Sequence, residues 1–405
     1  MKIFTMKSAE LEKRSFRLAF VQLGCPSYKR EMFENIAALP SVNLNLFIGD
    51  RHPSGHAPNG DLSGLKHLLI RNLILKIFGL QLVWQSINKH INPKNYDLII
   101  LPEGVLYFSN YLLMLRAFFA GTAVGFYSHG FNHQRKESIL GKLLEAVRQL
   151  VHRRAALVIT YSQTGADFIV RSNPAMAGRV FVALNTLDVN SIHETALSIS
   201  RNEILKMRTS WGFSLNDVVL AFVGRISNEK NPQFVISAVR ELRHEGFSVR
   251  ALFIGDGPAL QELRSCLLGE SEDVQASIKL LGRVSVSEVT PILKASDISV
   301  MPGMTGLAIV HSFAVGVPYV TIESPLHSPE IEYLISDVNG IITKNSNQSF
   351  IGGVRTLIKN PELRTKMGAS GNLYALANLG INKQMSGFEE AFKYVINSKK
   401  CATPA

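Results

Sequence analysis

Short, continuous apolar runs separated by helix-length segments constrain the fold of this 405-residue chain more than any other feature. Such runs are typical of parallel strands that helices bury on both faces. The first array of runs predicts strands at Phe16–Leu23, Asn43–Ile48, Tyr96–Leu101, Gly121–Tyr127, Ala156–Tyr161 and Val180–Leu184. After a polar, helix-prone stretch, a second array predicts strands at Asp217–Val223, Ala251–Ile254, Ile278–Leu281, Ile298–Met301, Tyr319–Thr321 and Ile341–Ile342.

Two arrays of similar size predict an α/β protein with two doubly wound domains. The length alone fits two or three domains, and the two arrays favour two. We expect an N-terminal domain over residues 1–190 and a C-terminal domain over residues 191–384. The remaining residues, 385–405, predict one amphipathic helix that packs back across the joint.

Positive charge is concentrated in the first half of the chain. The formal net charge is +11, and residues 1–200 hold 22 Lys and Arg against 13 Asp and Glu. Residues 201–405 hold 21 against 19, so the first half is expected to meet an anionic partner. Neither an aromatic stacking platform nor a reader motif accompanies the charge, so an anionic membrane surface is favoured over nucleic acid.

The segment 61–91 interrupts the alternation of strands and helices. It is rich in Leu and Ile, and its cations are Lys66, Arg71, Lys76 and Lys89. We interpret it as a buried helix pair of the first domain with the cations at its ends. The alternative is a basic amphipathic surface that rests on an anionic bilayer, with Trp84 near the headgroups.

The sequence also predicts where the protein works. Charges are scattered through the first twenty residues, so we expect no signal peptide, and no apolar run is long enough to predict a spanning helix. Three isolated cysteines predict neither a disulfide scaffold nor a structural metal site. We therefore expect a cytoplasmic protein, peripheral on the inner face of the cell membrane.

Glycines and cations follow the predicted strands of the second domain. Gly224 and Arg225 stand at the end of its first strand, and Lys230 lies on the same loop. Ligands of open α/β sheets bind at the carboxyl ends of the strands, and two cations there suit a diphosphate. Another strand ends at the same edge before Arg283 and Val284, whose backbone is a candidate to face a nucleotide base.

The segment Met301–Pro318 holds the densest group of candidate binding residues. A Pro-Gly turn containing Gly303 follows a predicted strand, and Gly306-Leu307 opens a helix. Free backbone N–H groups and the positive dipole end make a helix N-terminus an anion site. His311 lies five residues into this helix, where it is either a ligand contact or a structural residue.

These residues resemble the donor domain of retaining glycosyltransferases of the large family 4. Family members have a GR…K loop, a GDGP turn, a G-x-V loop, an E-x7-E block and a later PE…D-x-N-G segment. The residues that match are Gly224, Arg225, Lys230, Gly255, Asp256, Gly257, Pro258, Gly306, Leu307, Ala314, Gly316, Pro318, Pro329, Glu330, Asp337, Asn339 and Gly340. The resemblance covers residues 215–397 well and the first half weakly. It implies a GT-B fold, in which two Rossmann-like domains face a central cleft.

The chain departs from the family at the E-x7-E block. Gly303 and His311 stand where relatives have the two glutamates, which are associated with the donor sugar and the ribose. The form PGxxGLxxxH is similar to a subgroup of bacterial polysaccharide glycosyltransferases, in which histidine replaces the second glutamate. The resemblance implies that His311 and Glu330 contact the donor, and it puts the usual sugar contacts of the first glutamate in doubt.

Candidate residues of the first half also follow strands. His129 lies where the resemblance implies a histidine that faces the reacting sugar, and we assign it a catalytic role with Arg225 and Lys230. Gly24, after the first strand, is a candidate to bind the acceptor, although its loop could instead face the donor diphosphate, and Glu103, also at a strand end, is a candidate for binding acceptor hydroxyls.

The function expected from these patterns is transfer of a sugar, with retention, from a nucleotide-sugar donor to an acceptor such as a polyprenyl-diphosphate-linked saccharide. Polysaccharide or O-antigen biosynthesis is the setting implied by the subgroup. We expect neither a metal nor another cofactor. The alternatives are a non-catalytic subunit that binds nucleotide sugars and a nucleotide-sugar epimerase.

Overall fold

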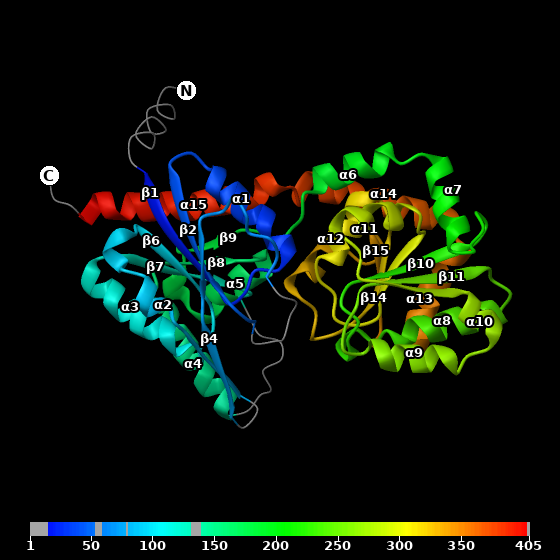
Figure 1. Cartoon of the computed structure of the whole chain (residues 1–405), viewed down its shortest axis with the longest axis horizontal. Coiled ribbons are helices and arrows are strands. Elements are labelled where there is room, and N and C mark those ends of the chain that lie inside the picture. Colours follow the sequence, from blue (N-terminus) through cyan, green and yellow to red (C-terminus); the bar gives the residue numbers. More distant parts are fainter. Residues whose placement is uncertain (1–14, 53–58, 78–79, 131–138, 403–405) are drawn as a thin grey trace. The chain divides into compact units, whose positions relative to one another are not determined.

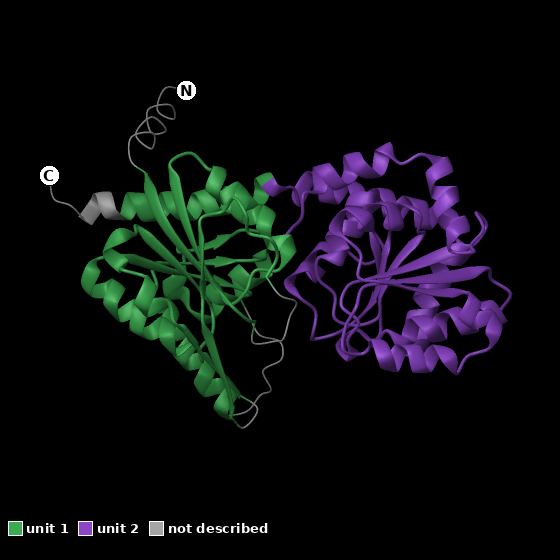
Figure 2. Ribbon diagram, viewed as in Figure 1, with its two compact units in different colours: residues 1–184, 382–405 green, residues 185–381 purple. Residues whose placement is uncertain are grey.

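Two parallel sheets, one in each of two compact units, form the framework of the protein (Figures 1 and 2). The structure is a computed structural model that describes residues 15–52, 59–77, 80–130 and 139–402. Unit 1 comprises residues 1–184 and 382–405, and unit 2 comprises residues 185–381. Residues 1–14, most of the first twenty residues in which no signal peptide is expected, lie outside the described residues.

The sheet of unit 1 has seven parallel strands in the order β3-β2-β1-β6-β7-β8-β9. The strands are β1 (Phe16–Gln22), β2 (Val42–Gly49), β3 (His67–Ile70), β6 (Leu98–Pro102), β7 (Ala123–Ser128), β8 (Leu157–Thr160) and β9 (Val180–Val182). All six strands predicted for this half are present, with slightly shifted ends. The strand order reverses between β1 and β6, and ligands of such sheets bind at that switch point.

Helices cover both faces of this sheet (Figure 1). They are α1 (Arg30–Ala38), α2 (Ile87–His90), α3 (Phe108–Ala120), α4 (Ile139–Arg154), α5 (Gln163–Ser172) and α15 (Ile381–Ala402). From Asn382 onward, α15 belongs to unit 1. Its fully buried Phe388 lies 5.7 Å from the Tyr127 ring and 6.2 Å from the Phe20 ring, centroid to centroid. The C-terminal helix therefore packs against β1 and β7, the strands that end at two candidate site loops.

The prediction of a helix pair over residues 61–91 is wrong. This segment forms β3, the antiparallel hairpin β4 (Asn72–Ile77) and β5 (Leu80–Gln85), and only the short α2. Leucine favours helices as an isolated residue, but the apolar residues of the two hairpin strands pair across them, as Leu73–Trp84, Leu75–Leu82 and Ile77–Leu80 do. Cross-strand pairing therefore overrides the helix propensity of the individual residues.

The sheet of unit 2 has six parallel strands in the order β12-β11-β10-β13-β14-β15. These strands are β10 (Val218–Val223), β11 (Val249–Ile254), β12 (Ile278–Gly282), β13 (Ile298–Met301), β14 (Tyr319–Ile322) and β15 (Gly340–Thr343), as the sequence predicts. The helices are α6 (Val189–Ser198), α7 (Arg201–Ser210), α8 (Gln233–His244), α9 (Leu260–Leu268), α10 (Glu272–Ala276), α11 (Val286–Lys294), α12 (Ala308–Val315), α13 (Asn347–Lys359) and α14 (Pro361–Asn378). The switch point lies between β10 and β13.

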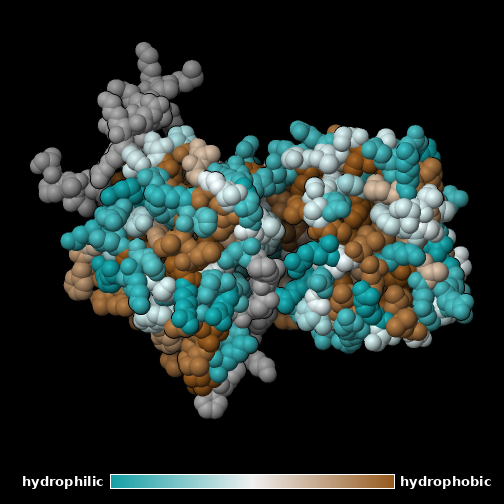
Figure 3. Space-filling model, viewed as in Figure 1, coloured by the Kyte–Doolittle hydropathy of each residue, from teal (hydrophilic) through white to brown (hydrophobic). Residues whose placement is uncertain are grey.

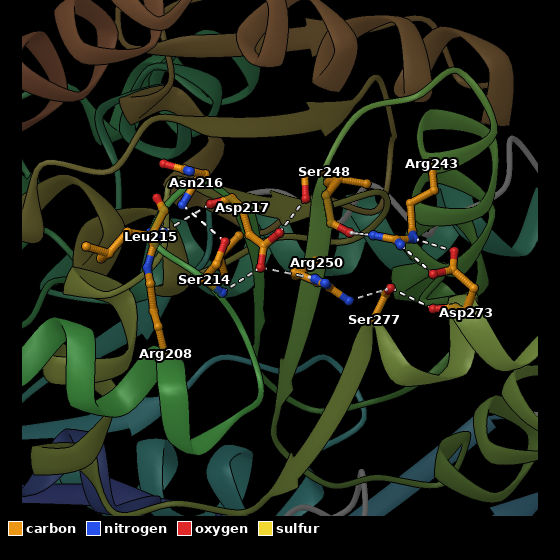
Figure 4. Close-up of polar contacts among 12 residues, drawn as sticks. Arg208, Ser214, Leu215, Asn216, Asp217, Arg243, Ser248, Arg250, Asp273 and Ser277 are labelled. Atoms are coloured by element: carbon orange, nitrogen blue, oxygen red, sulfur yellow. Dashed lines mark hydrogen bonds and ion pairs between the residues drawn. The ribbon is translucent and has the colours of Figure 1, made fainter.

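A polar network around the buried side chains of Asp217 and Arg208 holds the amino ends of the central strands of unit 2 (Figure 4). The Asp217 carboxylate accepts hydrogen bonds from the Ser214 backbone (2.7 Å) and the Ser248 hydroxyl (2.5 Å), and its ion pair with Arg250 spans 3.2 Å. Burial opposes ionisation of this carboxyl, but the Ser248 and Ser214 hydrogen bonds and Arg250 lower its pKa overall. Arg208 donates to the Asp217 backbone oxygen at 3.0 Å. These contacts join α7, β10 and β11 at the edge opposite the candidate site.

Candidate functional site

Gly224 and Lys230 meet at the carboxyl end of β10, at the switch point of unit 2. Gly224 has a φ of 136°, a conformation that side-chain-bearing residues rarely adopt. A Cβ atom at this position would lie 3.3 Å from the Lys230 Nζ. The ammonium group of Lys230 therefore lies beside the bare backbone of the turn.

Lys230 is a buried cation, with only 9% of its surface exposed. Desolvation lowers the pKa of Lys230 to about 8, although Glu229 and Glu330 raise it, and Arg225 lowers it further. The free-energy cost of burying the charge thus exceeds the favourable electrostatic interaction with the two neighbouring carboxyl groups. An anionic ligand would compensate this charge, which makes the position suitable for a diphosphate.

The close packing of Gly303 explains why no glutamate can occupy its position in this structure. A Cβ atom there would collide with the Glu229 backbone oxygen and lie 2.6 Å from the Lys230 Cα. The Met304 N–H donates to that Glu229 oxygen at 2.8 Å, and the Asn231 side chain donates to the Pro302 oxygen at 2.8 Å. The loop that places Lys230 is therefore held directly against the turn after β13.

Glu330 is a buried carboxyl group, and one of its oxygens accepts no hydrogen bond from the described residues. It is 3% exposed and lies on the 3-10 turn Pro329–Tyr333. Its Oε1 accepts a hydrogen bond from the Asn185 side chain, whereas its Oε2 has no hydrogen-bond partner among the described residues. Burial raises the pKa of Glu330, against the lowering effects of Asn185 and Lys230. A Cβ on Gly306 would lie 3.9 Å from Oε2, so this oxygen faces the loop that leads into α12.

The helix N-terminus that the sequence predicts is present, because α12 begins at Ala308, just after Gly306 and Leu307. His311 points elsewhere. Its Nε2 lies 2.8 Å from the Thr290 hydroxyl of α11, and the side chain is 5% exposed. Desolvation lowers the pKa of His311 to about 4, so the ring is neutral at physiological pH. The observed contact is structural, and a contact with the donor stays a prediction.

The remaining predicted residues of unit 2 are less closely joined to this cluster. Arg225 is half-buried beside Gly224, and its charge acts on Lys230. Arg283 is exposed at the end of β12, and Val284 packs against the hydrophobic core. Since β12 is an edge strand of the sheet, these two residues lie two strands away from the switch point.

Gly24 and His129 follow β1 and β7 of unit 1, and the charge of Lys29 acts on His129. Lys29 donates to Gln22 at 3.0 Å and to the Tyr161 hydroxyl at 3.4 Å, while the His129 and Tyr161 rings lie 4.4 Å apart. Although His129 remains exposed, desolvation and then the charge of Lys29 lower its pKa to about 4. The sequence analysis missed Lys29. Its signal is a lysine that follows a glycine at the end of a strand by a few residues, as Lys29 follows Gly24 and Lys230 follows Gly224.

Glu103 lies inside a hydrogen-bonded cluster. Its Oε1 lies 2.5 Å from the His152 Nε2 and 3.7 Å from Arg148, and its Oε2 accepts a hydrogen bond from Ser128. Burial would raise the pKa of Glu103, but the His152 hydrogen bond and the positive charges outweigh it, and the pKa falls to about 2. Both oxygens thus have internal partners, which sequence reasoning did not anticipate for a predicted acceptor-binding group.

This cluster fixes the turn that carries His129. The Ser128 hydroxyl accepts a hydrogen bond from the Gly130 N–H at 2.8 Å, and Arg148 donates to the Gly130 oxygen at 2.6 Å. Gly130 has a φ of 84°, and a Cβ atom would collide with the Gly165 backbone. Glu103 and Arg148 therefore act through the backbone on the placement of His129.

Within residues 15–52, 59–77, 80–130 and 139–402, no group of three or more His, Cys, Asp or Glu side chains is placed to hold a metal ion. Over the same ranges, no helix combines the length and apolarity needed to cross a bilayer.

The sequence of unit 2 has recognisable relatives. Residues 203–373 match the family Glycosyl transferases group 1. The chain is 23% identical to the putative glycosyltransferase EpsD of Bacillus subtilis, over 73% of this chain and 76% of that protein. It is 28% identical to an alpha-monoglucosyldiacylglycerol synthase of Streptococcus pneumoniae, over 34% of this chain and about a third of that protein's length (31%). Similarity to glycosyltransferases therefore covers the part of the chain that contains the Lys230 cluster.

Solved structures confirm the GT-B fold, with two Rossmann-like domains built on parallel sheets. HepE of Anabaena, solved in complex with UDP, superposes with a TM-score of 0.70 at 17% identity, covering 93% of this chain and 99% of HepE. Sucrose-phosphate synthase of Thermosynechococcus elongatus gives a TM-score of 0.68 at 14% identity, covering 95% and 100% of the two chains.

Proposed function

We propose that this protein is a glycosyltransferase that takes its sugar from a nucleotide-sugar donor held by unit 2. The observation that carries the proposal is the Lys230 cluster, which lies within the segment that matches Glycosyl transferases group 1. A buried, desolvated ammonium group at a sheet switch point is suited to the diphosphate of such a donor. HepE, a structural neighbour, has been solved with UDP-glucose.

The leaving nucleoside diphosphate gains negative charge as the glycosidic bond breaks. Lys230 and Arg225 would stabilise this charge, together with the free N–H groups at the start of α12. The Oε2 of Glu330, which has no partner among the described residues, would accept a hydrogen bond from a hydroxyl of the nucleotide sugar. Gly303 has no side chain to make such a contact. No step of this scheme needs a metal ion, and by family resemblance the anomeric configuration is retained.

The acceptor would be a lipid-linked saccharide, such as one on a polyprenyl diphosphate, and unit 1 would bind it through the Gly24 loop. His129 would contact the transferred sugar. The names of several relatives support this choice of acceptor, since they include a diacylglycerol glycoside synthase and a putative colanic acid biosynthesis glycosyltransferase of Escherichia coli. A protein with such an acceptor would work at the cytoplasmic face of a membrane.

A thermal-shift screen of nucleotides and nucleotide sugars tests the donor assignment, because a ligand that binds the native state raises its unfolding temperature. We expect UDP or GDP to raise the unfolding temperature of the wild-type protein and to leave that of Arg225→Ala unchanged. An equal rise in the variant, or no rise with any nucleotide, would overturn the assignment.

A non-catalytic subunit that binds nucleotide sugars is the second candidate, because Gly303 and His311 replace both family glutamates. Binding without any transfer or hydrolysis of the donor would favour that subunit. Interconversion of free nucleotide sugars would instead identify an epimerase.

A further inference from the structure

One face of the hairpin formed by β4 and β5 is wholly apolar. Its side chains form three cross-strand pairs, Leu73–Trp84, Leu75–Leu82 and Ile77–Leu80. Side chains on paired strands alternate between the two faces, so these six share one face. Four of the six are between 40 and 57% exposed, and the other two are half-buried. A two-stranded ribbon with such a face is only marginally stable in water without further packing.

Buried amides fix the root of this hairpin to the carboxyl end of β1. The Asn72 side chain donates to the Leu23 oxygen at 2.8 Å, and the Gln85 side chain donates to the Gln22 oxygen at 3.1 Å and to the Asn72 side chain at 3.0 Å. Both amide side chains are at most 1% exposed. The apolar face is therefore attached rigidly beside the Gly24 loop.

The stretch of sequence that contains the hairpin is basic and has no acidic residues. No Asp or Glu occurs from residue 62 to residue 96. The five Lys and Arg residues of this stretch are exposed: Lys66, Arg71, Lys76, Lys89 and Lys94. In the part of the chain that the structure describes, the recorded salt bridges include none of these five.

Figure 3 shows apolar surface at the lower end of unit 1 in that view, where the ribbons of β4 and α4 end in Figure 1. Hydrophilic surface borders it in the same view. An apolar patch with a polar and basic surround is the pattern of surfaces that rest in the interface of a bilayer.

We propose that the apolar face of the β4–β5 hairpin inserts into the interface of an anionic lipid bilayer, while the exposed cations Arg71 and Lys76, at its base and on its first strand, contact the headgroups. This inference rests on the proposed lipid-linked acceptor, because it would hold the Gly24 loop near the membrane. A second copy of the chain fits the same face less well. In a symmetric dimer through this face, Arg71 and Lys76 of both copies would be brought to one interface, and neither hairpin strand has an acidic residue to balance them.

Trp84 makes the proposal directly measurable. The chain has two tryptophans, and Trp211→Phe in unit 2 leaves Trp84 as the single fluorescent reporter. Vesicles of equal parts phosphatidylglycerol and phosphatidylcholine should shift its emission to the blue, and brominated lipid in them should quench it. Vesicles of phosphatidylcholine alone should bind much more weakly, since each basic residue near an anionic surface contributes to binding.

In sedimentation with the mixed vesicles, Leu75→Asn should bind about tenfold more weakly than the parent. The matched control Leu268→Asn changes a 73% exposed leucine of unit 2 and should bind as the parent does. Equal binding by Leu75→Asn, or no change in Trp84 emission with vesicles, would refute the insertion. Dimers in sedimentation velocity that Leu75→Asn dissociates would instead identify a second copy as the occupant and overturn the proposal.

The same variants separate this surface from the proposed chemistry. Leu75→Asn should keep the full UDP-induced rise in unfolding temperature, because the Lys230 cluster lies in the other unit. A protein that binds vesicles through the hairpin but binds no nucleotide would refute the proposed function and leave the membrane surface intact. A protein that binds nucleotide but not vesicles would refute the membrane surface and leave the proposed function intact.

Discussion

Replacing Lys230 with methionine is expected to stabilise the unliganded protein and to abolish its response to UDP. Burial lowers the pKa of Lys230 from the usual 10.5 to about 8, even with Glu229 and Glu330 nearby. Since each tenfold change in a proton equilibrium is worth about 1.4 kcal/mol, the buried charge costs about 3 kcal/mol. The cost is complete below pH 8 and disappears as the pH rises toward 10.5.

Methionine keeps an unbranched chain of similar length without the charge. We expect an increase in the free energy of unfolding of about 1–3 kcal/mol at pH 7, which raises the unfolding temperature by roughly 2–4 °C per kcal/mol for a domain of this size. Thermal unfolding monitored with and without UDP measures both effects. Stabilisation accompanied by loss of binding is common where function requires an unfavourable buried group.

Lys344→Met, which changes an exposed lysine of unit 2, is the matched control and should alter neither measurement. A lower unfolding temperature for Lys230→Met would mean that the ammonium group is a stabilising partner of Glu330, contrary to the reasoning. An undiminished response to UDP would remove Lys230 from the diphosphate site.

Three further perturbations have defined outcomes. Affinity for UDP should fall by about tenfold per pH unit above pH 8, because the bound state needs protonated Lys230, and calorimetry should find no such fall for Lys230→Arg. Gly303→Ala forces the adjoining loop away, so it should lower the free energy of unfolding by about 1–3 kcal/mol and weaken UDP binding, whereas Gly352→Ala, which has open space, should do neither. Glu103→Gln removes the carboxylate that His152 and Arg148 face, while Arg148 keeps its 2.6 Å ion pair with Glu145, so it should cost about 1–3 kcal/mol. In the wild type, the stability from Glu103 is complete above pH 4.5 and is lost as the pH falls toward 2, so acid unfolding followed by circular dichroism should lose that step in the variant.

The framework and the donor loops could be predicted from sequence because their signals are local. A strand buried on both faces must be apolar throughout, and all twelve predicted strands are present. The tight turns at Gly224 and Gly303 need residues without a Cβ atom, so glycine marks them in the sequence.

Features that depend on distant contacts could not be predicted in this way. The sequence predicts helices where β4 and β5 form a hairpin, because leucine-rich segments suit either structure and only pairing between the two strands decides between them. The cluster around Glu103 joins residues from β7 and α4 that are far apart in the chain, so the internal partners of this strand-end carboxyl group leave no local signal in the sequence. The partner of His311 on α11 was hidden for the same reason.

Transfer of labelled sugar is the most direct test of the central claim. Purified full-length protein would be incubated with a panel of radiolabelled nucleotide sugars and a bacterial lipid extract, and the organic phase would be counted. We expect label from one donor to move into the lipid fraction with the wild-type protein and Lys344→Met, and to stay in the aqueous phase with Lys230→Met. Equal transfer by Lys230→Met, or UDP binding by a wild-type protein that moves no label from any donor, would contradict the claim.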